Sequence, residues 1–350
     1  MTARPLRLLV LLVLLVPVLV AGCSDGPHVV LYVSADDHVA RPIIRTFERQ
    51  SGIRVDMVGD TEQRKTTGLV KRLLAERDNP QADVFWSSEV FNTILLAGHG
   101  VLAGHDSAVA ADRPAVFRDP EHLWHGFGAR ARVIVYAPDR VKPERVPRTW
   151  MGLTDERLRG RIVMADPRFG TTGGHLAAMK VFWARLAGTS YYEAFLMGLA
   201  ENRVRLLPGG NAGVVRAVAD GEADLGLTDT DDVWAAMAAG RNVRHVYPRH
   251  AIDGVSGGGT LLIPNTVARV ANGPNPQPAA ALIDFLLSDQ VERMLAESTS
   301  HNIPVRAAIA AEFPEYAVPD PLEVNLSRVA ALMPDAIDQA MRLLEERDAP

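Results

Sequence analysis

The chain has 350 residues but only one cysteine, Cys23, so no disulfide can form within it and the fold depends on its core. Aromatic residues make up 6% of the chain, whereas hydrophobic residues reach 47%, which is typical of a folded globular protein. The sequence contains no internal repeat and no low-complexity segment, and this argues against solenoids and stalked adhesion proteins.

The chain also lacks an excess of basic residues. Its formal net charge is −5, and this becomes more negative if a leader that contains Arg4 and Arg7 but no acid is removed. A mildly acidic protein without a basic stripe cannot neutralise successive phosphates along a duplex. We therefore expect no nucleic-acid partner.

The N-terminus has the pattern of a bacterial export signal. Arg4 and Arg7 precede the apolar run "LLVLLVLLVPVLV", which is too short for a stable membrane span and ends in small residues. The motif "VAGC" resembles a lipobox, in which the cysteine is diacylated and becomes the new N-terminus. We therefore expect residues 1–22 to be a lipoprotein signal peptide. The mature protein, a monomer, is then held by Cys23 on the outer face of the cytoplasmic membrane or in the periplasm.

The remaining chain alternates short β-branched runs with amphipathic helical stretches, which predicts an α/β fold with doubly wound, mostly parallel sheets. The predicted strands are 29–35, 53–59, 82–88, 130–137, 161–167, 204–209, 223–229 and 258–270. Strand segments near 130 and 260 can connect the same two lobes, so a hinge of two crossings is expected. The predicted divisions are lobe 1 from 28–129 plus 260–310, lobe 2 from 130–259, and a C-terminal helical segment, 311–350.

Several segments, in this order and spacing, carry a family resemblance over the whole mature chain. They are "YVSADDHVARPIIRTFERQSGIRV", "NPQADVFWSSE", "GFGARARVIVYAPD", "GTTGGH", "PGGNAGVVRAVADGEADLGLTDTDD", and "GGTLLIPNTVARV" with "LIDFLLSDQVERMLAES". The chain resembles the type II periplasmic binding proteins of ABC importers, and within them the ferric-ion-binding group. The resemblance implies two α/β lobes that close over a small ligand, and an ABC permease as partner.

The resemblance also implies a metal site, which this sequence does not match. Ferric-binding members hold iron with two adjacent tyrosines after the strand that ends here at Leu227, yet this chain has Asp229, Thr230 and Asp231 there. Its own adjacent tyrosines, 191 and 192, lie in a predicted helix, where packing is the expected role. The expected cofactor is therefore none, with a metal ion plus a synergistic anion as the alternative.

The anion half of the family's pocket matches better. A glycine-rich turn leads into the helix that begins near Thr171, and backbone N–H groups at such an N-terminus bind anions without a cationic side chain. Arg130, at the proposed crossing, would add a bidentate grip on phosphate or carboxylate. The residues expected on this half are Arg130, Thr171, Thr172, Gly173 and Asn211.

An acidic cluster would form the other half and face a positive centre, either a metal or an organic ammonium. The residues expected there are Ser34, Asp36, Ser88, Glu89, Thr228, Asp229 and Asp231, of which Asp36, Glu89, Asp229 and Asp231 would bind a metal if one is present. A second interpretation remains open, because Thr228 or Asp229 can also cap the following helix. The predicted ligand is an organic phosphonate or phosphate with a positive end, and the alternative is ferric iron.

An enzyme is not expected, although two patterns raise the question. The motif "GVSGG" matches the G-x-S-x-G of serine hydrolases, but Ser256 leads into a strand instead of standing between a strand and a helix. His38, His175 and His250 lack the spacing of a zinc-binding helix, so we expect them to be capping or surface residues. An exported serine hydrolase is the remote alternative.

Overall fold

The computed structural model describes residues 26–59, 65–251 and 255–345. The predicted signal peptide and Cys23 lie outside these residues, so lipid anchoring stays a prediction. Within the described part, no helix combines the length and apolar character needed to cross a membrane.

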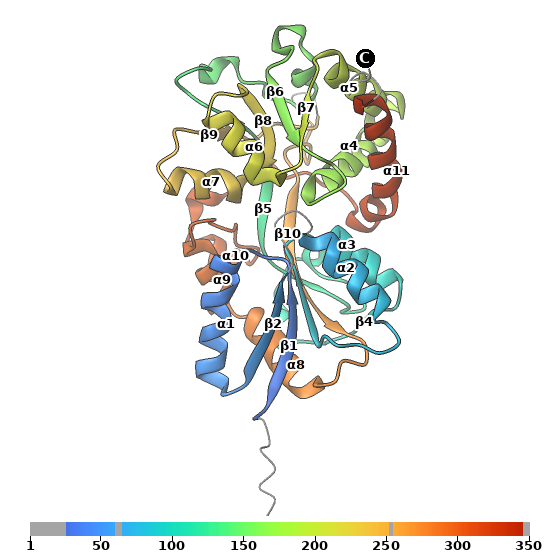
Figure 1. The fold of residues 1–350 in the computed structure, drawn as a ribbon, viewed down its shortest axis with the longest axis vertical. Coiled ribbons are helices and arrows are strands. Elements are labelled where there is room, and N and C mark those ends of the chain that lie inside the picture. The colour runs from blue at the N-terminus through green and yellow to red at the C-terminus, as the bar shows by residue number, and fades with distance from the viewer. Residues whose placement is uncertain (1–25, 60–64, 252–254, 346–350) are drawn as a thin grey trace, which may run out of the picture.

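The elements alternate as the sequence predicts (Figure 1). The strands are β1 His28–Val33, β2 Arg54–Gly59, β3 Val84–Ser87, β4 Leu102–Ala103, β5 His125–Tyr136, β6 Ile162–Ala165, β7 Arg205–Leu207, β8 Leu225–Asp229, β9 Arg244–Val246 and β10 Leu262–Val270. The α-helices are α1 Asp37–Ser51, α2 Lys65–Ala75, α3 Phe91–Gly98, α4 Thr171–Ala187, α5 Ser190–Glu201, α6 Gly210–Ala219, α7 Thr230–Ala238, α8 Pro276–Leu286, α9 Asp289–Glu297, α10 Ala307–Ala310 and α11 Leu326–Glu345.

The main sheet path runs β2-β1-β3-β10-β5-β8-β6-β7, with β4 added to β10 and β9 added to β5. The pairs β1–β2, β1–β3, β6–β7 and β6–β8 are parallel, as expected for strands joined by crossover helices. We call the part built on β1–β4 lobe 1 and the part built on β6–β9 lobe 2. Figure 1 shows them stacked along the long axis, with β5 and β10 running between them.

The two crossings lie side by side. The first half of β5 pairs with β10, and its second half, from Arg132, pairs with β8. The long apolar run of β5 is explained by this path, because nearly all of its residues are buried between the lobes. The proposed hinge positions near 130 and 260 fall at these crossings.

Helix α11 packs mainly on α4 of lobe 2, and it also contacts α3 of lobe 1 and α5 of lobe 2. The Tyr192 hydroxyl, buried in α5, donates to the Ala336 carbonyl of α11 at 3.0 Å. The predicted packing role of the adjacent tyrosines is thereby confirmed for Tyr192. Lobe 1 also contacts lobe 2 behind the crossings, because Gly174 of α4 lies against the Phe91 ring of α3.

Candidate functional site between the lobes

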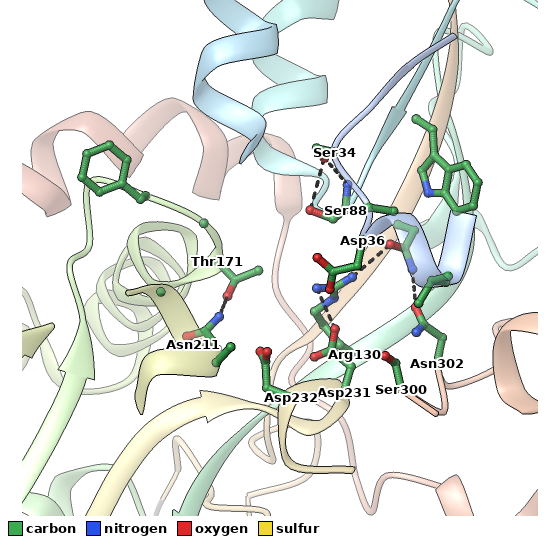
Figure 2. A pocket seen from close by; sticks show the side chains of 18 of the residues that line it. Ser34, Asp36, Ser88, Arg130, Thr171, Asn211, Asp231, Asp232, Ser300 and Asn302 are labelled. Atoms are coloured by element: carbon green, nitrogen blue, oxygen red, sulfur yellow. Dashed lines mark hydrogen bonds and ion pairs between the residues drawn. The ribbon is translucent and has the colours of Figure 1, made fainter. Parts of the chain in front are cut away.

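A cavity of about 100 Å³ lies between the lobes, next to the crossing strands (Figure 2). Four helices begin at its wall: α1 and its preceding loop from lobe 1, and α4, α6 and α7 from lobe 2. Parallel strands end at this edge of each sheet, and ligands of open α/β sheets bind at such edges. The lining residues are Ser34, Ala35, Asp36, Val39, Trp86, Ser88, Arg130, Phe169, Gly170, Thr171, Pro208, Gly209, Gly210, Asn211, Ala212, Asp231, Asp232, Asn265, Leu295, Ser300 and Asn302.

The four helix N-termini differ in charge. The first turns of α1 and α7 carry acidic residues, Asp37 in α1 and Asp231 with Asp232 in α7. The first turns of α4 and α6 carry none. The positive ends of α4 and α6 therefore remain available to an anion, whereas the α1 and α7 side of the cavity presents carboxylates. In Figure 2, Thr171 and Asn211 face Asp36 and Arg130 across the cavity, so the two sides are separate in space.

Among the described residues that line the cavity, the one cation is Arg130 on β5, which lies on the acidic side. Its Nη1 lies 2.8 Å from Asp231 Oδ2, and its Nη2 donates to Asn265 Oδ1 at 3.0 Å. Arg130 Nε and Asp231 Oδ1 are buried without a hydrogen-bond partner among the described residues. Arg130 was expected to grip the ligand's anion, but its side chain lies with the carboxylates instead.

The electrostatics of Asp231 follow from its burial. Burial raises the pKa of Asp231 to about 6; the nearby Arg130 lowers it, and the carboxylates of Asp229 and Asp36 raise it further. Any additional positive charge nearby would stabilise the ionised form of this carboxylate and lower its pKa. A ligand cation would supply that charge.

Asp229 lies behind the cavity wall and is fully buried. It stands opposite Arg132 in the antiparallel β5–β8 pair, and Arg132 Nη1 lies 2.7 Å from Asp229 Oδ1. Its other oxygen accepts hydrogen bonds from Thr171 Oγ1 at 2.6 Å and from Asn211 Nδ2 at 2.8 Å. Asp229 precedes α7, but its side chain makes no capping hydrogen bond. Asp229 therefore neither lines the cavity nor caps α7 with its side chain, so its position differs from both interpretations of the sequence.

Four further residues expected at the site do not line the cavity. Glu89 is buried and accepts hydrogen bonds from the backbone N–H groups of Phe91 and Asn92, so it caps α3, and burial raises its pKa. Thr172 is buried, Gly173 packs closely against Pro167 and Ile337, and Thr228 donates to the Asn211 carbonyl. The direction of each side chain explains the difference. These residues follow a strand, lie near the end of one or begin a helix, but their side chains face the protein interior.

Six expected residues line the cavity in addition to Arg130, namely Ser34, Asp36, Ser88, Thr171, Asn211 and Asp231. Ser34 and Ser88 hold adjacent loops together, since Ser34 Oγ accepts from the Ser88 backbone N–H at 2.8 Å. Sequence reasoning missed Asp232, which directly follows an expected residue, and also Trp86, Phe169, Asn265, Ser300 and Asn302. Ser300 and Asn302 follow α9, where no sequence pattern indicated a site.

The three histidines that the sequence raised as candidates differ in burial. His38 is exposed, but His175 and His250 are buried, so the expectation of capping or surface positions is wrong for these two. The rings of His175 and His250 are hydrogen-bonded to each other inside lobe 2, with 3.0 Å between their Nε2 atoms.

The serine of the hydrolase motif, Ser256, lies in an exposed turn before β10. It does not stand in the strand-to-helix turn of a nucleophile elbow.

The chain is similar to known iron-uptake and phosphonate-binding proteins. It is 27% identical over 302 residues to iron uptake protein A1 of Synechocystis sp., with 83% of this chain and 80% of that protein covered. It is 26% identical over 251 residues to a putative 2-aminoethylphosphonate-binding periplasmic protein of Salmonella typhimurium, with 71% and 69% covered.

The fold is similar to that of iron-bound HitA from Pseudomonas aeruginosa. The TM-score is 0.78 at 22% identity, and the match covers 91% of this chain and 99% of HitA. The expected type II periplasmic binding-protein fold is thereby confirmed. A family model described as "Bacterial extracellular solute-binding protein" matches residues 79–323. With its two α/β lobes and a cavity between them, the chain belongs to the family of bacterial extracellular solute-binding proteins.

Proposed function

We propose that this protein captures an organic phosphonate or phosphate ester that also carries a positive group, and delivers it to an ABC permease in the cytoplasmic membrane. The observation that carries the proposal is the unequal charge of the cavity. The N-termini of α4 and α6, whose first turns carry no acid, form one side, and the carboxylates of Asp36, Asp231 and Asp232 form the other. Phosphonate oxygens suit the first side, and an ammonium group suits the second. The 2-aminoethylphosphonate named for the Salmonella relative has both groups.

Ferric iron with a synergistic anion is the second candidate, and two observations favour it. The Synechocystis relative is named for iron uptake, and carboxylate oxygens of Asp229, Asp231 and Asp232 lie within 4.8 Å of one another. However, both oxygens of Asp229 are engaged by Arg132, Thr171 and Asn211. None of the chain's six tyrosines, all of them in the described part, lines the cavity. The donor set therefore favours an organic cation over ferric iron.

Isothermal titration calorimetry with three ligands tests the proposal. We expect 2-aminoethylphosphonate to bind at least about tenfold more tightly than ethylphosphonate, because only the former places a cation against the carboxylates. Ferric citrate should bind weakly and give no visible charge-transfer band, since no tyrosine is among the described residues that line the cavity. Tight and coloured binding of ferric citrate, without phosphonate binding, would establish the iron alternative instead.

A pair of variants locates the cation. Asp232→Asn should weaken 2-aminoethylphosphonate and leave ethylphosphonate unchanged, because it removes one carboxylate from the acidic side. Asp335→Asn, on the exposed face of α11, is the matched control and should alter neither affinity. Equal loss of both ligands in Asp232→Asn would place the amine elsewhere.

A further inference from the structure

The Thr171 and Asn211 side chains line the cavity, yet all of their hydrogen-bond donors point away from it. The Thr171 hydroxyl donates to Asp229 Oδ2 at 2.6 Å. The two N–H bonds of Asn211 Nδ2 are used by Thr171 Oγ1 and Asp229 Oδ2, both at 2.8 Å. A hydroxyl has one donor and a primary amide has two, so neither side chain has a donor left for an anion.

Arg132 organises this arrangement from behind the cavity. Its side chain is fully buried, and Nη1 lies 2.7 Å from Asp229 Oδ1, 3.0 Å from Thr171 Oγ1 and 3.3 Å from Asn211 Oδ1. One guanidinium nitrogen thus contacts β8 and the first turns of α4 and α6. Of the four helices that begin at the cavity, α4 and α6 are the two whose first turns carry no acid.

Two histidines fix the other edge of the guanidinium. His250 Nδ1 lies 2.6 Å from the Gly259 carbonyl, which can only accept, so Nδ1 carries the proton and Nε2 is an acceptor. His175 Nε2 must then donate to His250 Nε2, and His175 Nδ1 accepts from Arg132 Nε at 3.2 Å. Both rings are neutral in this arrangement, in agreement with burial, which lowers the pKa of His250 to about 3 and that of His175 well below its usual range.

We propose that Arg132 is a positioning residue for the anion side of the cavity, and that the ligand's anion is bound there by backbone N–H groups of α4 and α6 and not by the Thr171 and Asn211 side chains. The proposal deepens the proposed function and rests on it for the ligand. Arg132 and Asp229 together hold the two helix N-termini at a fixed separation. The first N–H groups of each helix have no partner within the helix and face the bound oxyanion.

Substitution of Asp229 distinguishes the two binding modes by the sign of the effect. If the Thr171 and Asn211 side chains bound the anion directly, Asp229→Asn would replace their competing carboxylate by a weaker amide acceptor and strengthen binding. Under the positioning role, Asp229→Asn separates the helix ends and weakens binding of inorganic phosphate and 2-aminoethylphosphonate by about tenfold or more. Unchanged or tighter binding of both probes would overturn the proposal.

Removal of one buried charge is expected to destabilise the fold, so a second variant keeps the charges balanced. Arg132→Gln/Asp229→Asn removes the pair together and should fold, yet bind both probes at least tenfold more weakly. Arg157→Gln makes the same arginine change at an exposed side chain that does not line the cavity, and it should bind normally. A double variant with wild-type affinity would show that the pair does not position the site.

Proton exchange tests the positioning role without any ligand. In the wild type the Asn211 side-chain amide protons should exchange slowly, because both are bonded inside the network. The double variant should exchange them faster, while Arg157→Gln should not, and unchanged slow exchange in the double variant would overturn the positioning role. If the wild type binds neither probe but exchange responds as expected, the proposed ligand is wrong while the positioning role of Arg132 stands.

Discussion

Asp231 should make the ligand-free protein less stable while it strengthens ligand binding. Its pKa is about 6 in the folded protein against 3.8 for an unperturbed carboxyl, chiefly because of burial. The folded state therefore holds this proton more strongly than the unfolded state does. The resulting stability is fully present below pH 3.8, declines as pH rises from 3.8 to 6, and is lost above that. At about 1.4 kcal/mol per pKa unit, the upper bound of the loss is roughly 3 kcal/mol.

Asp231→Asn should restore most of the stability that is lost when the buried Asp231 carboxyl ionises. The amide keeps a similar shape and an oxygen that can accept from Arg130, but it carries no buried charge. At pH 7.5 we expect the free energy of unfolding to rise by about 2 kcal/mol and the melting temperature by several degrees. At pH 3.5 the variant and the wild type should be nearly equal. Affinity for 2-aminoethylphosphonate should fall by about tenfold, because the ammonium loses a charged partner.

Urea denaturation at both pH values, together with calorimetric titration, measures these effects. Asp139→Asn is the control, since that side chain is 59% exposed and should show little change at either pH. The reasoning fails if Asp231→Asn is less stable than the wild type at pH 7.5. That result would mean that the Arg130–Asp231 pair contributes more than the burial of its carboxylate costs.

Three other predictions concern packing, closure and export. Gly174→Ala would place a Cβ 2.1 Å from the Phe91 ring and should destabilise the protein by about 1–3 kcal/mol in urea denaturation, whereas Gly213→Ala, with open space around it, should be neutral or stabilising. Small-angle scattering should give a smaller radius of gyration with saturating 2-aminoethylphosphonate than without, and an unchanged profile would contradict closure of the lobes. Cys23→Ser should leave folding intact but release the protein from the membrane fraction; a variant that stays acylated and membrane-bound would refute the lipobox.

The strands and helices could be predicted because their signals are local. The apolar run at 223–229 contains β8, Leu225–Asp229, and the predicted C-terminal helical segment, 311–350, contains α11, Leu326–Glu345. Strands β4 and β9 were not predicted, since two or three residues are too few to show a periodic pattern. Gly52 ends α1 in the left-handed conformation, which glycine adopts without strain, so the end of this helix also has a local cause.

Most of the expected residues that line the cavity follow the ends of strands or begin helices. Asp36 and Ser88 follow strands of lobe 1, and their place at the cavity comes from the common edge of a parallel sheet. Asn265 lies within β10, and Asn302 follows α9, so both reach the cavity only through the packing of elements distant in sequence. Their own amide interaction, 2.6 Å from Asn265 Nδ2 to Asn302 Oδ1, joins these two segments beside Arg130. No local pattern contains that information.

The acidic residues after β8 gain their separate roles from the strand opposite. The motif "RAR" of β5 places two arginines two positions apart. The motif "DTD", which begins at the last residue of β8, places two aspartates two positions apart. Arg132 is registered against Asp229, and Arg130, two residues earlier in the antiparallel strand, reaches Asp231 beyond the strand's end. The inner pair is completed by Thr171 and Asn211 and is closed to solvent. The outer pair opens on the cavity and retains a buried nitrogen and oxygen without partners among the described residues. In the proposed function, these like charges at alternate positions provide both the support of the anion side and the acceptor for a ligand's cation, and only the strand register distinguishes the two pairs.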